Sequence, residues 1–179
     1  MKSASIVDVV SSCANWKRVC PDAERLARRC TRAALANGIA ATGLTLPARV
    51  ELTITLTDDA QQRQLNHKYR GRNAATNVLA FPGWQPGAQL PLGAPLMLGD
   101  VVLAFETVAR EAEEQAKPFA DHLCHLIVHG ALHLLGFDHQ GEAEAIAMER
   151  LETAVLARLG VRDPYRERKW SIETEPISP

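Results

Sequence analysis

Three histidines in the C-terminal half of the chain have the spacing of metal ligands. His129 and His133 lie four residues apart, and His139 follows with Gly136 between them. Imidazoles at positions i and i+4 of a helix project from one face about one turn apart, so both can reach the same ion. Because glycine lets the backbone turn sharply, His139 can return as a third ligand. Three protein ligands with one open position are typical of catalytic zinc.

The same spacing occurs in the metzincin signature H-E-x-x-H-x-x-G-x-x-H, but one chemically important position differs. Gly130 stands where metzincins carry the glutamate that serves as general base. Without that carboxylate, the usual metalloprotease route to an activated water is missing. The pattern therefore favours a catalytic metal and disfavours peptidase chemistry. Zinc is the preferred ion, although nickel and iron also accept three imidazoles.

Two side chains beside the ligands are candidates for a supporting role. His125 precedes His129 by four residues and falls on the same stripe of the expected helix, where it supports the site or is simply packed. Asp138 is adjacent to His139, and orienting a ligand imidazole suits it better than acting as general base. If the metal were structural, either side chain would be a candidate fourth ligand.

The helices and strands that position these residues can be predicted from the periodicity of apolar residues and from the residues that typically begin or end an element. Strict alternation over 49–56 marks a half-buried strand, and Thr57 before two aspartates is a helix start. Pro118 suits the first turn of the helix that carries the histidines, and Gly136 suits its end. We expect strands at 5–10, 49–56, 77–81 and 101–105, a loop at 82–97, and helices at 22–38, 58–68, 106–116, 119–135 and 142–159.

These elements predict one α/β (α+β) domain over residues 1–160. A sheet of three or four strands packs with about five helices, and the metal site lies at the end of a central helix. The chain has 179 residues, of which 46% are hydrophobic and 23% charged, which suits a single domain with its own core. Residues 161–179 contain three prolines and are expected to form a loosely ordered tail.

The composition of the chain limits the kinds of binding partner and the cellular compartment that we expect. A net charge of −1 gives no global basic signal for nucleic acid, so RNA binding would need a local patch such as Lys68, Arg70 and Arg72. No apolar run is long enough for a membrane helix, and Asp8 interrupts any signal-peptide core, so we expect a cytoplasmic protein. The four cysteines form no CxxC pair and are expected to be reduced thiols.

Several segments together resemble the YbeY endoribonucleases, a family of rRNA maturation factors. The segment from His125 to His139, HLIVHGALHLLGFDH, is similar to the family's signature. Residues 65–71, 76–82 and 98–102 resemble its "LN…YRG", "T-D-V-L-S-F-P" and "L-G-D-I-x" segments in the same order. Two positions depart from the pattern: Asn77 replaces a common aspartate, and Ala80 replaces a common serine. Neither change removes a metal ligand.

The resemblance implies a single-strand-specific, zinc-dependent endoribonuclease that acts in maturation of the 16S rRNA 3′ end and in ribosome quality control. It implies His129, His133 and His139 as ligands of one zinc ion, with His129 and Arg70 in the catalytic machinery. Single-stranded ribosomal RNA would be the substrate, and the small ribosomal subunit with its assembly factors would be the partners. Lys68 and Arg72 are candidates for further RNA contacts.

Two other functions remain open from the residues alone. One is a metal-dependent hydrolase of a small molecule or peptide, which the metzincin spacing suggests. The other is a non-catalytic ribosome-assembly factor with a structural metal, which requires a fourth protein ligand. A metal site with three histidines and an open position would distinguish either enzyme from the assembly factor.

Overall fold

A four-stranded mixed sheet forms the base of the molecule. The computed structural model describes residues 4–47, 49–89, 94–138 and 141–166. Strands β1 (Ala4–Ser11), β2 (Arg49–Thr57), β4 (Leu96–Ala104) and β3 (Val78–Pro82) are ordered β1-β2-β4-β3 across the sheet. The first three are parallel, and β3 pairs with β4 in the antiparallel direction. The chain is therefore an α/β domain with one antiparallel edge strand.

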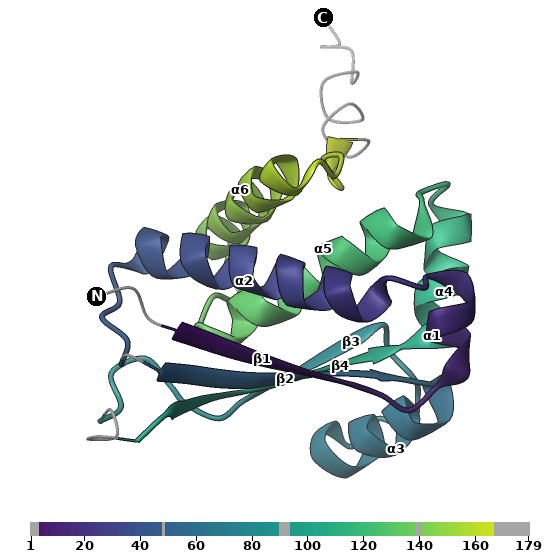
Figure 1. Ribbon diagram of the computed structural model, residues 1–179, viewed down its shortest axis with the longest axis horizontal. Helices are drawn as coiled ribbons and strands as arrows, with labels where there is room; N and C mark the ends of the chain where they lie inside the picture. Colours follow the sequence, from purple (N-terminus) through teal and green to yellow (C-terminus); the bar gives the residue numbers. More distant parts are fainter. Residues whose placement is uncertain (1–3, 48, 90–93, 139–140, 167–179) are drawn as a thin grey trace, which may run out of the picture.

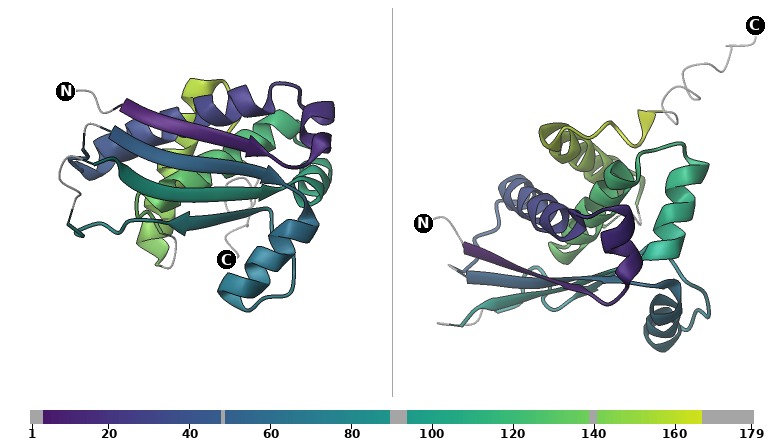
Figure 2. Two further views of the ribbon diagram at one scale, coloured as in Figure 1. Left: turned by 60° about the horizontal axis from the view of Figure 1, so that its bottom comes forward. Right: turned by 45° about the vertical axis from the view of Figure 1, so that its right-hand side comes forward.

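The helices are divided unequally between the two faces of the sheet (Figure 1). Helices α2 (Ala23–Thr42) and α5 (Phe119–Leu134) cover one face, and α6 (Glu142–Leu159) packs outside them. Helix α3 (Asp59–Arg70) lies on the opposite face (Figure 2). The short α1 (Ala14–Val19) and α4 (Phe105–Glu114) follow the ends of β1 and β4. Helix α5 is thus central, between the sheet and α6.

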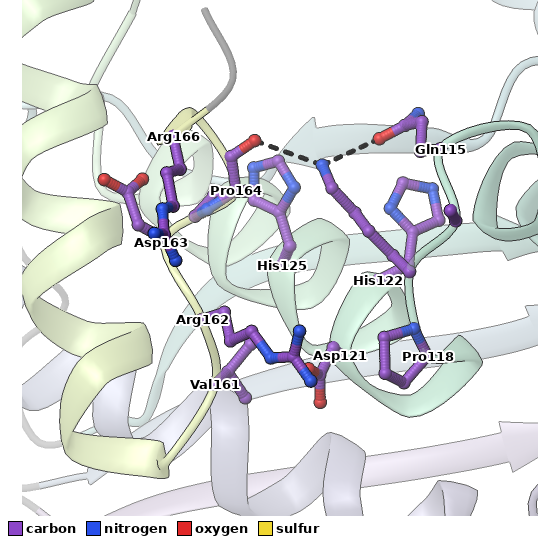
Figure 3. Close-up of a pocket in the computed structure, with 12 residues that line it drawn as sticks. Gln115, Pro118, Asp121, His122, His125, Val161, Arg162, Asp163, Pro164 and Arg166 are labelled. Carbon is purple, nitrogen blue, oxygen red and sulfur yellow. Dashed lines mark hydrogen bonds between the residues drawn. The ribbon is translucent and has the colours of Figure 1, made fainter. Parts of the chain in front are cut away.

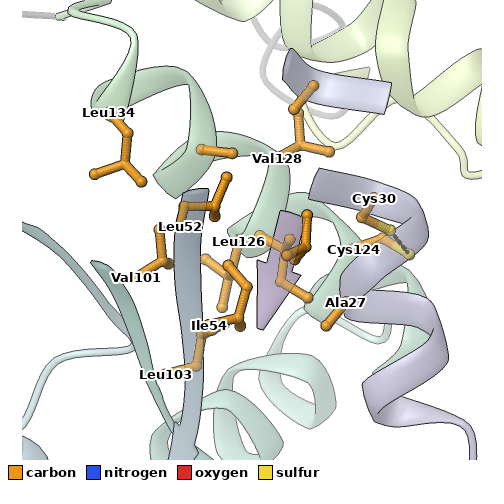
Figure 4. Packing of buried hydrophobic residues seen from close by; sticks show 14 of the residues in the cluster. Ala27, Cys30, Leu52, Ile54, Val101, Leu103, Cys124, Leu126, Val128 and Leu134 are labelled. Carbon is orange, nitrogen blue, oxygen red and sulfur yellow. Dashed lines mark hydrogen bonds between the residues drawn. The ribbon is translucent and has the colours of Figure 1, made fainter. Parts of the chain in front are cut away.

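Small residues on α2 let it approach α5 closely. Ala27, Cys30, Ala34 and Gly38 recur at helical spacing, and the first three are fully buried. The Cys30 thiol donates to the Sγ of Cys124 on α5 at 3.0 Å in the core between the two helices (Figure 4). Apolar side chains of β2 and β4 complete this core, among them Leu52, Ile54, Val101 and Leu103.

Two glycines fix where α5 lies and where it ends. A Cβ on Gly130 would sit 2.6 Å from Cγ1 of Val101, so the helix backbone can rest on β4 only without a side chain there. Gly136 has a φ of +89°, and the amides of Gly136 and Phe137 donate to the carbonyls of His133 and Leu132. This pairing is a Schellman motif, which stops the helix directly after the second histidine.

Most elements lie where the sequence places them, but α2 runs to Thr42, four residues beyond its predicted end, and there are three further differences. Helix α1 was not predicted, and it raises the helix count from about five to six in the described residues. Strand β4 begins at Leu96 rather than at Val101, so the predicted loop over 82–97 is too long at its end. Of the expected tail, residues 161–166 are described, and Tyr165 among them is buried. No helix in the described part of the chain is long and apolar enough to cross a membrane.

Candidate active site

A cavity of about 580 Å³ opens where the C-terminal half of α5 meets the edge strand β3. Helix α5 contributes His129 and His133, because residues four apart share a helix face. Helix α3, from the other face of the sheet, contributes Arg70 at its last position. The remaining walls come from Gly130 of α5, from β3 with the residue before it, and from the turn after α5. They comprise Asn77, Val78, Ala80, Pro82, Gly130, Gly136, Phe137 and Asp138.

The two described histidines of the predicted metal site, His129 and His133, face each other at a separation close to that of two zinc ligands. The Nε2 atoms of His129 and His133 lie 3.0 Å apart. Two nitrogens bound to one tetrahedral zinc at 2.0–2.1 Å would lie about 3.3 Å apart, so a small shift suffices. The expected third ligand, His139, lies outside the described residues. Within the described residues, no group of three His, Cys, Asp or Glu side chains is arranged to hold a metal.

A buried carboxylate on α6 fixes the orientation of His129. Oε1 of Glu152 lies 2.7 Å from Nδ1 of His129, and its Oε2 lies 3.1 Å from Nε2 of His125. The hydroxyl of Tyr165 also donates to this carboxylate. Because an ionised carboxylate only accepts hydrogen bonds, Nδ1 of His129 carries the proton, and the electron pair of the neutral ring lies on Nε2, which faces Nε2 of His133. Such a pairing fixes the tautomer that a metal ligand requires.

The charge of Glu152 is maintained despite its burial. Burial alone would raise the pKa of this side chain, but hydrogen bonds from His125, His129 and Tyr165 lower that pKa to about 2. Glu152 is therefore a carboxylate at neutral pH. It places a negative charge behind the imidazole of His129 and makes Nε2 of that ring a better electron-pair donor.

The predicted basic residues do not all reach the cavity. Arg70 lines it, and Gly71, with a φ of +68°, ends α3 directly after Arg70. Lys68 and Arg72 are exposed and do not line the cavity, and Nζ of Lys68 lies 5.1 Å from the ring centroid of Tyr69. The structure thus separates one arginine beside the histidines from two cations on the surrounding surface.

The two positions that depart from the family pattern both line the cavity. The Asn77 amide donates to both oxygens of Glu111 at 3.1 and 2.9 Å, and Nε2 of His122 lies 2.8 Å from Oε2 of the same carboxylate. Ala80 contributes only a methyl group. Asp138 also lines the cavity. Its position beside His139 in the sequence predicts that it orients that imidazole, and His139 lies outside the described residues.

Three contributors to this region were not predicted from sequence: Glu152, Tyr165 and Glu111. Glu152 does carry a signal, since it sits among the buried positions Met148, Val155 and Leu156 of α6. A carboxylate at a buried helix position is rarely left without a partner. No comparable pattern marks Tyr165, which follows a proline in the segment after α6.

Comparison with known proteins agrees with this geometry. The family model described as Endoribonuclease YbeY matches residues 16–160. The endoribonuclease YbeY of Rhodopseudomonas palustris strain BisA53 is 48% identical over 165 residues, which cover 92% of this chain and 91% of that protein. The protein of the same name from Paramagnetospirillum magneticum is 51% identical over 158 residues, covering 87% and 93%.

The fold also has a counterpart among solved structures. The solution structure of TM1509 from Thermotoga maritima superimposes with a TM-score of 0.51 at 17% identity, covering 96% of this chain and 97% of that one. That match supports the α/β architecture alone. The family model and the two curated relatives decide the identity: the chain belongs to the YbeY endoribonuclease family and is a hydrolase that cleaves phosphodiester bonds within RNA.

Proposed function

We propose that the chain is a zinc-dependent, single-strand-specific endoribonuclease that matures the 3′ end of 16S rRNA and takes part in ribosome quality control. Membership of the family implies a metal-dependent enzyme with an RNA substrate. The observation that supports a catalytic metal most directly is the pair of facing Nε2 atoms, 3.0 Å apart, with Glu152 behind His129.

In this proposal His129, His133 and His139 hold one zinc ion, and a solvent or substrate atom takes the fourth position. When bound, the ion supplies Lewis acidity, which acidifies water and polarises a phosphoryl oxygen. His129 presents its electron pair in a fixed direction because Glu152 holds its Nδ1 proton. Nickel or another divalent transition metal would suit the same imidazoles, so metal identity is part of the test.

Arg70 is the proposed partner of the scissile phosphate. Phosphodiester cleavage passes through an anionic transition state, and a guanidinium beside it supplies charge and two parallel hydrogen bonds. Arg70 is the cationic side chain among the residues that line the cavity. Either a water or the RNA 2′-hydroxyl is compatible with this arrangement as nucleophile.

Outside the cavity, Lys68 and Arg72 are proposed to contact the RNA backbone. Both are exposed close to Arg70 and would track phosphates without reading sequence. We assign the enzymatic domain to residues 1–160 and the tail to 161–179. We also propose the cytoplasm as its compartment and the small ribosomal subunit with its assembly factors as its partners.

One experiment tests the proposal as a whole. Purified protein is analysed for metal and assayed on single-stranded and double-stranded RNA, alongside His133→Ala and the control His67→Ala from α3. We expect close to one equivalent of zinc and single-strand cleavage in the wild type and the control. His133→Ala should lose both metal and cleavage. A His133→Ala protein that keeps its full metal content would disprove the ligand assignment.

A further inference from the structure

A second cavity is lined in part by His122 and His125, and we propose that it binds one nucleotide through its ribose phosphate. The cavity has a volume of about 640 Å³, within the usual range for small-molecule sites. It is formed by the start of α5, the turn before it and the segment after α6 (Figure 3). Arg70, His129 and His133 do not line it, so it is separate from the candidate active site.

Two histidines of α5, His122 and His125, are among the residues that line this cavity. His122 is 3% exposed and His125 is partly buried, and the Nδ1 atoms of both are buried without a hydrogen-bond partner among the described residues. Their Nε2 atoms are already engaged by Glu111 and Glu152. Because these carboxylates accept the Nε2 protons, each neutral ring is left with an electron pair on Nδ1. The matching ligand groups are O–H or N–H donors.

Cationic side chains around the cavity favour a ligand that also carries an anionic group. Arg162 and Arg166 lie in the segment after α6 that faces α5 (Figure 3). Lys117 lines the same cavity and comes just before α5 in the chain. Nζ of Lys117 donates to two neutral oxygens, Oε1 of Gln115 and the carbonyl of Pro164, so these contacts leave its charge uncompensated. Asp121 and Asp163 also line the cavity, and their charges partly offset the three cations.

These two demands together select the ligand class. A bare anion would place acceptors against the acceptors of His122 and His125, and an uncharged polyol would not balance the positive charge that Asp121 and Asp163 leave over. A ribose phosphate carries both groups: its hydroxyls can donate to the Nδ1 atoms, and its phosphate can accept from Arg162, Arg166 and Lys117. Since the enzyme acts on RNA, such units are present in its substrate and in its products.

The position of the cavity connects it to catalysis. His125 and His129 are successive residues on one face of α5, and both hydrogen-bond to Glu152. A ligand on Nδ1 of His125 would therefore contact the same carboxylate network that orients His129. The nucleotide has two sources, a residue of the RNA strand being cut or a free mononucleotide, and the same chemistry recognises both.

Direct binding measurements on chelator-treated protein test the proposal without any cleavage. Calorimetry with AMP and with a short oligouridylate is carried out on the full chain, Arg162→Glu, and the control Arg18→Glu on exposed α1. We expect saturable AMP binding that Arg162→Glu weakens roughly tenfold or more, the usual effect of losing a charged hydrogen bond, and that Arg18→Glu leaves unchanged. A second variant, Gln115→Trp, fills the cavity from an exposed position and should also reduce binding.

The nucleotide analogues and the RNA distinguish the remaining outcomes. Dideoxy-AMP lacks the ribose hydroxyls and should bind more weakly than AMP. AMP that competes with oligouridylate identifies the site as part of the RNA path, whereas independent binding identifies a free nucleotide as the ligand. The proposal would be overturned if inorganic phosphate bound with the same affinity as AMP, or if AMP bound with equal affinity to all variants. Circular dichroism checks that each variant is folded.

Discussion

At the scale of single residues, the centre of the site is a carboxylate rather than a histidine. Glu152 is fully buried and accepts hydrogen bonds from His125, His129 and Tyr165. An ionised group without partners would be costly at this depth, so these donors stabilise the charge as much as the charge orients them. The orientation of His129 therefore depends on α6 and on the segment that follows it.

Replacing this carboxylate should weaken metal binding without removing a ligand. Glu152→Gln keeps the shape of the side chain but loses the charge, so His129 becomes a poorer donor and can adopt the wrong tautomer. We expect a loss of roughly 10–100-fold in zinc affinity, measured by competition with a chromophoric chelator. Glu113→Gln, on the exposed surface of α4, is the control. Equal affinity in both variants would show that Glu152 only fills space.

Arg70 should affect turnover and leave the metal in place. If its guanidinium stabilises the transition state, Arg70→Ala lowers single-turnover cleavage by roughly 10²–10³. Arg70→Lys rescues little, because lysine lacks the planar two-pronged contact. Arg72→Ala should instead weaken RNA binding and flatten its salt dependence. Zinc is measured on the same samples. If Arg70→Ala cleaved at the wild-type rate, Arg70 would be a surface cation with no part in the transition state.

Sequence spacing predicted that His129 and His133 converge, but it did not predict the side chains that support them. His129 and His133 could be found because both lie on one helix, where spacing alone predicts convergence. Glu152 lies on a different helix, so its approach to His129 depends on how α6 crosses α5, which no local pattern encodes. Arg70 was found only through family resemblance, since its place beside the cavity depends on α3 reaching the edge of the sheet.

At the scale of elements, the packing of α5 on the sheet explains why residue 130 is a glycine. Gly130 lies where α5 crosses the sheet, and a Cβ would come within 2.6 Å of Val101 and 3.3 Å of Val78. The glutamate that metzincins carry at this position would thus have no room. The difference that argued against peptidase chemistry is also a requirement for packing α5 on β3 and β4.

The tight contact at Gly130 predicts that a glycine-to-alanine change in this helix lowers stability, the opposite of the usual effect. Glycine to alanine inside a helix normally stabilises by up to about 1 kcal/mol. Gly130→Ala should instead destabilise by about 1–3 kcal/mol, because the added methyl overpacks the contact with β4. Urea unfolding of Gly130→Ala, Val101→Ala and the double variant measures the coupling. A double variant less stable than the sum of the single effects would contradict the clash.

Element boundaries were predicted best where periodicity was long. Helices α5 and α6 and strand β2 have clear repeats and ended within about two residues of the prediction. Helix α1 has only six residues, too few for a recognisable period, and is held by Trp16, whose Nε1 donates to the carbonyl of Thr57. The start of β4 was missed because it follows a stretch rich in glycine and proline.

At the scale of the whole molecule, a second carboxylate joins three elements. Glu111 on α4 accepts from Asn77, next to β3, and from His122 on α5. Burial alone would raise the pKa of Glu111, but hydrogen bonds from His122 and Asn77 and the charge of Arg110 bring it below its ordinary value. The connection between sheet and helices is therefore strongest when Glu111 is ionised.

The sign of this shift predicts how stability depends on pH. Because the folded-state pKa is lower than the unfolded one, the stabilisation is present above the unfolded pKa and is lost as pH falls through the folded value. Thermal unfolding of wild type and Glu111→Gln should differ by a constant Tm gap at neutral pH, and the gap should shrink below about pH 4. Glu113→Gln should show little gap at any pH. A gap that widens in acid would reverse the assignment.

The contact between two buried thiols on α2 and α5 provides a way to measure how often these two helices separate. Hydrogen bonding between Cys30 and Cys124, together with burial, raises the pKa of Cys124 well above its ordinary range. The thiolate is the form that attacks alkylating reagents, so we expect these buried sulfurs to react only when the two helices separate. Mass spectrometry should find Cys13 modified promptly and the buried pair modified at the rate of opening. Their labelling rate thus measures how often the helix that carries the histidines leaves its neighbour.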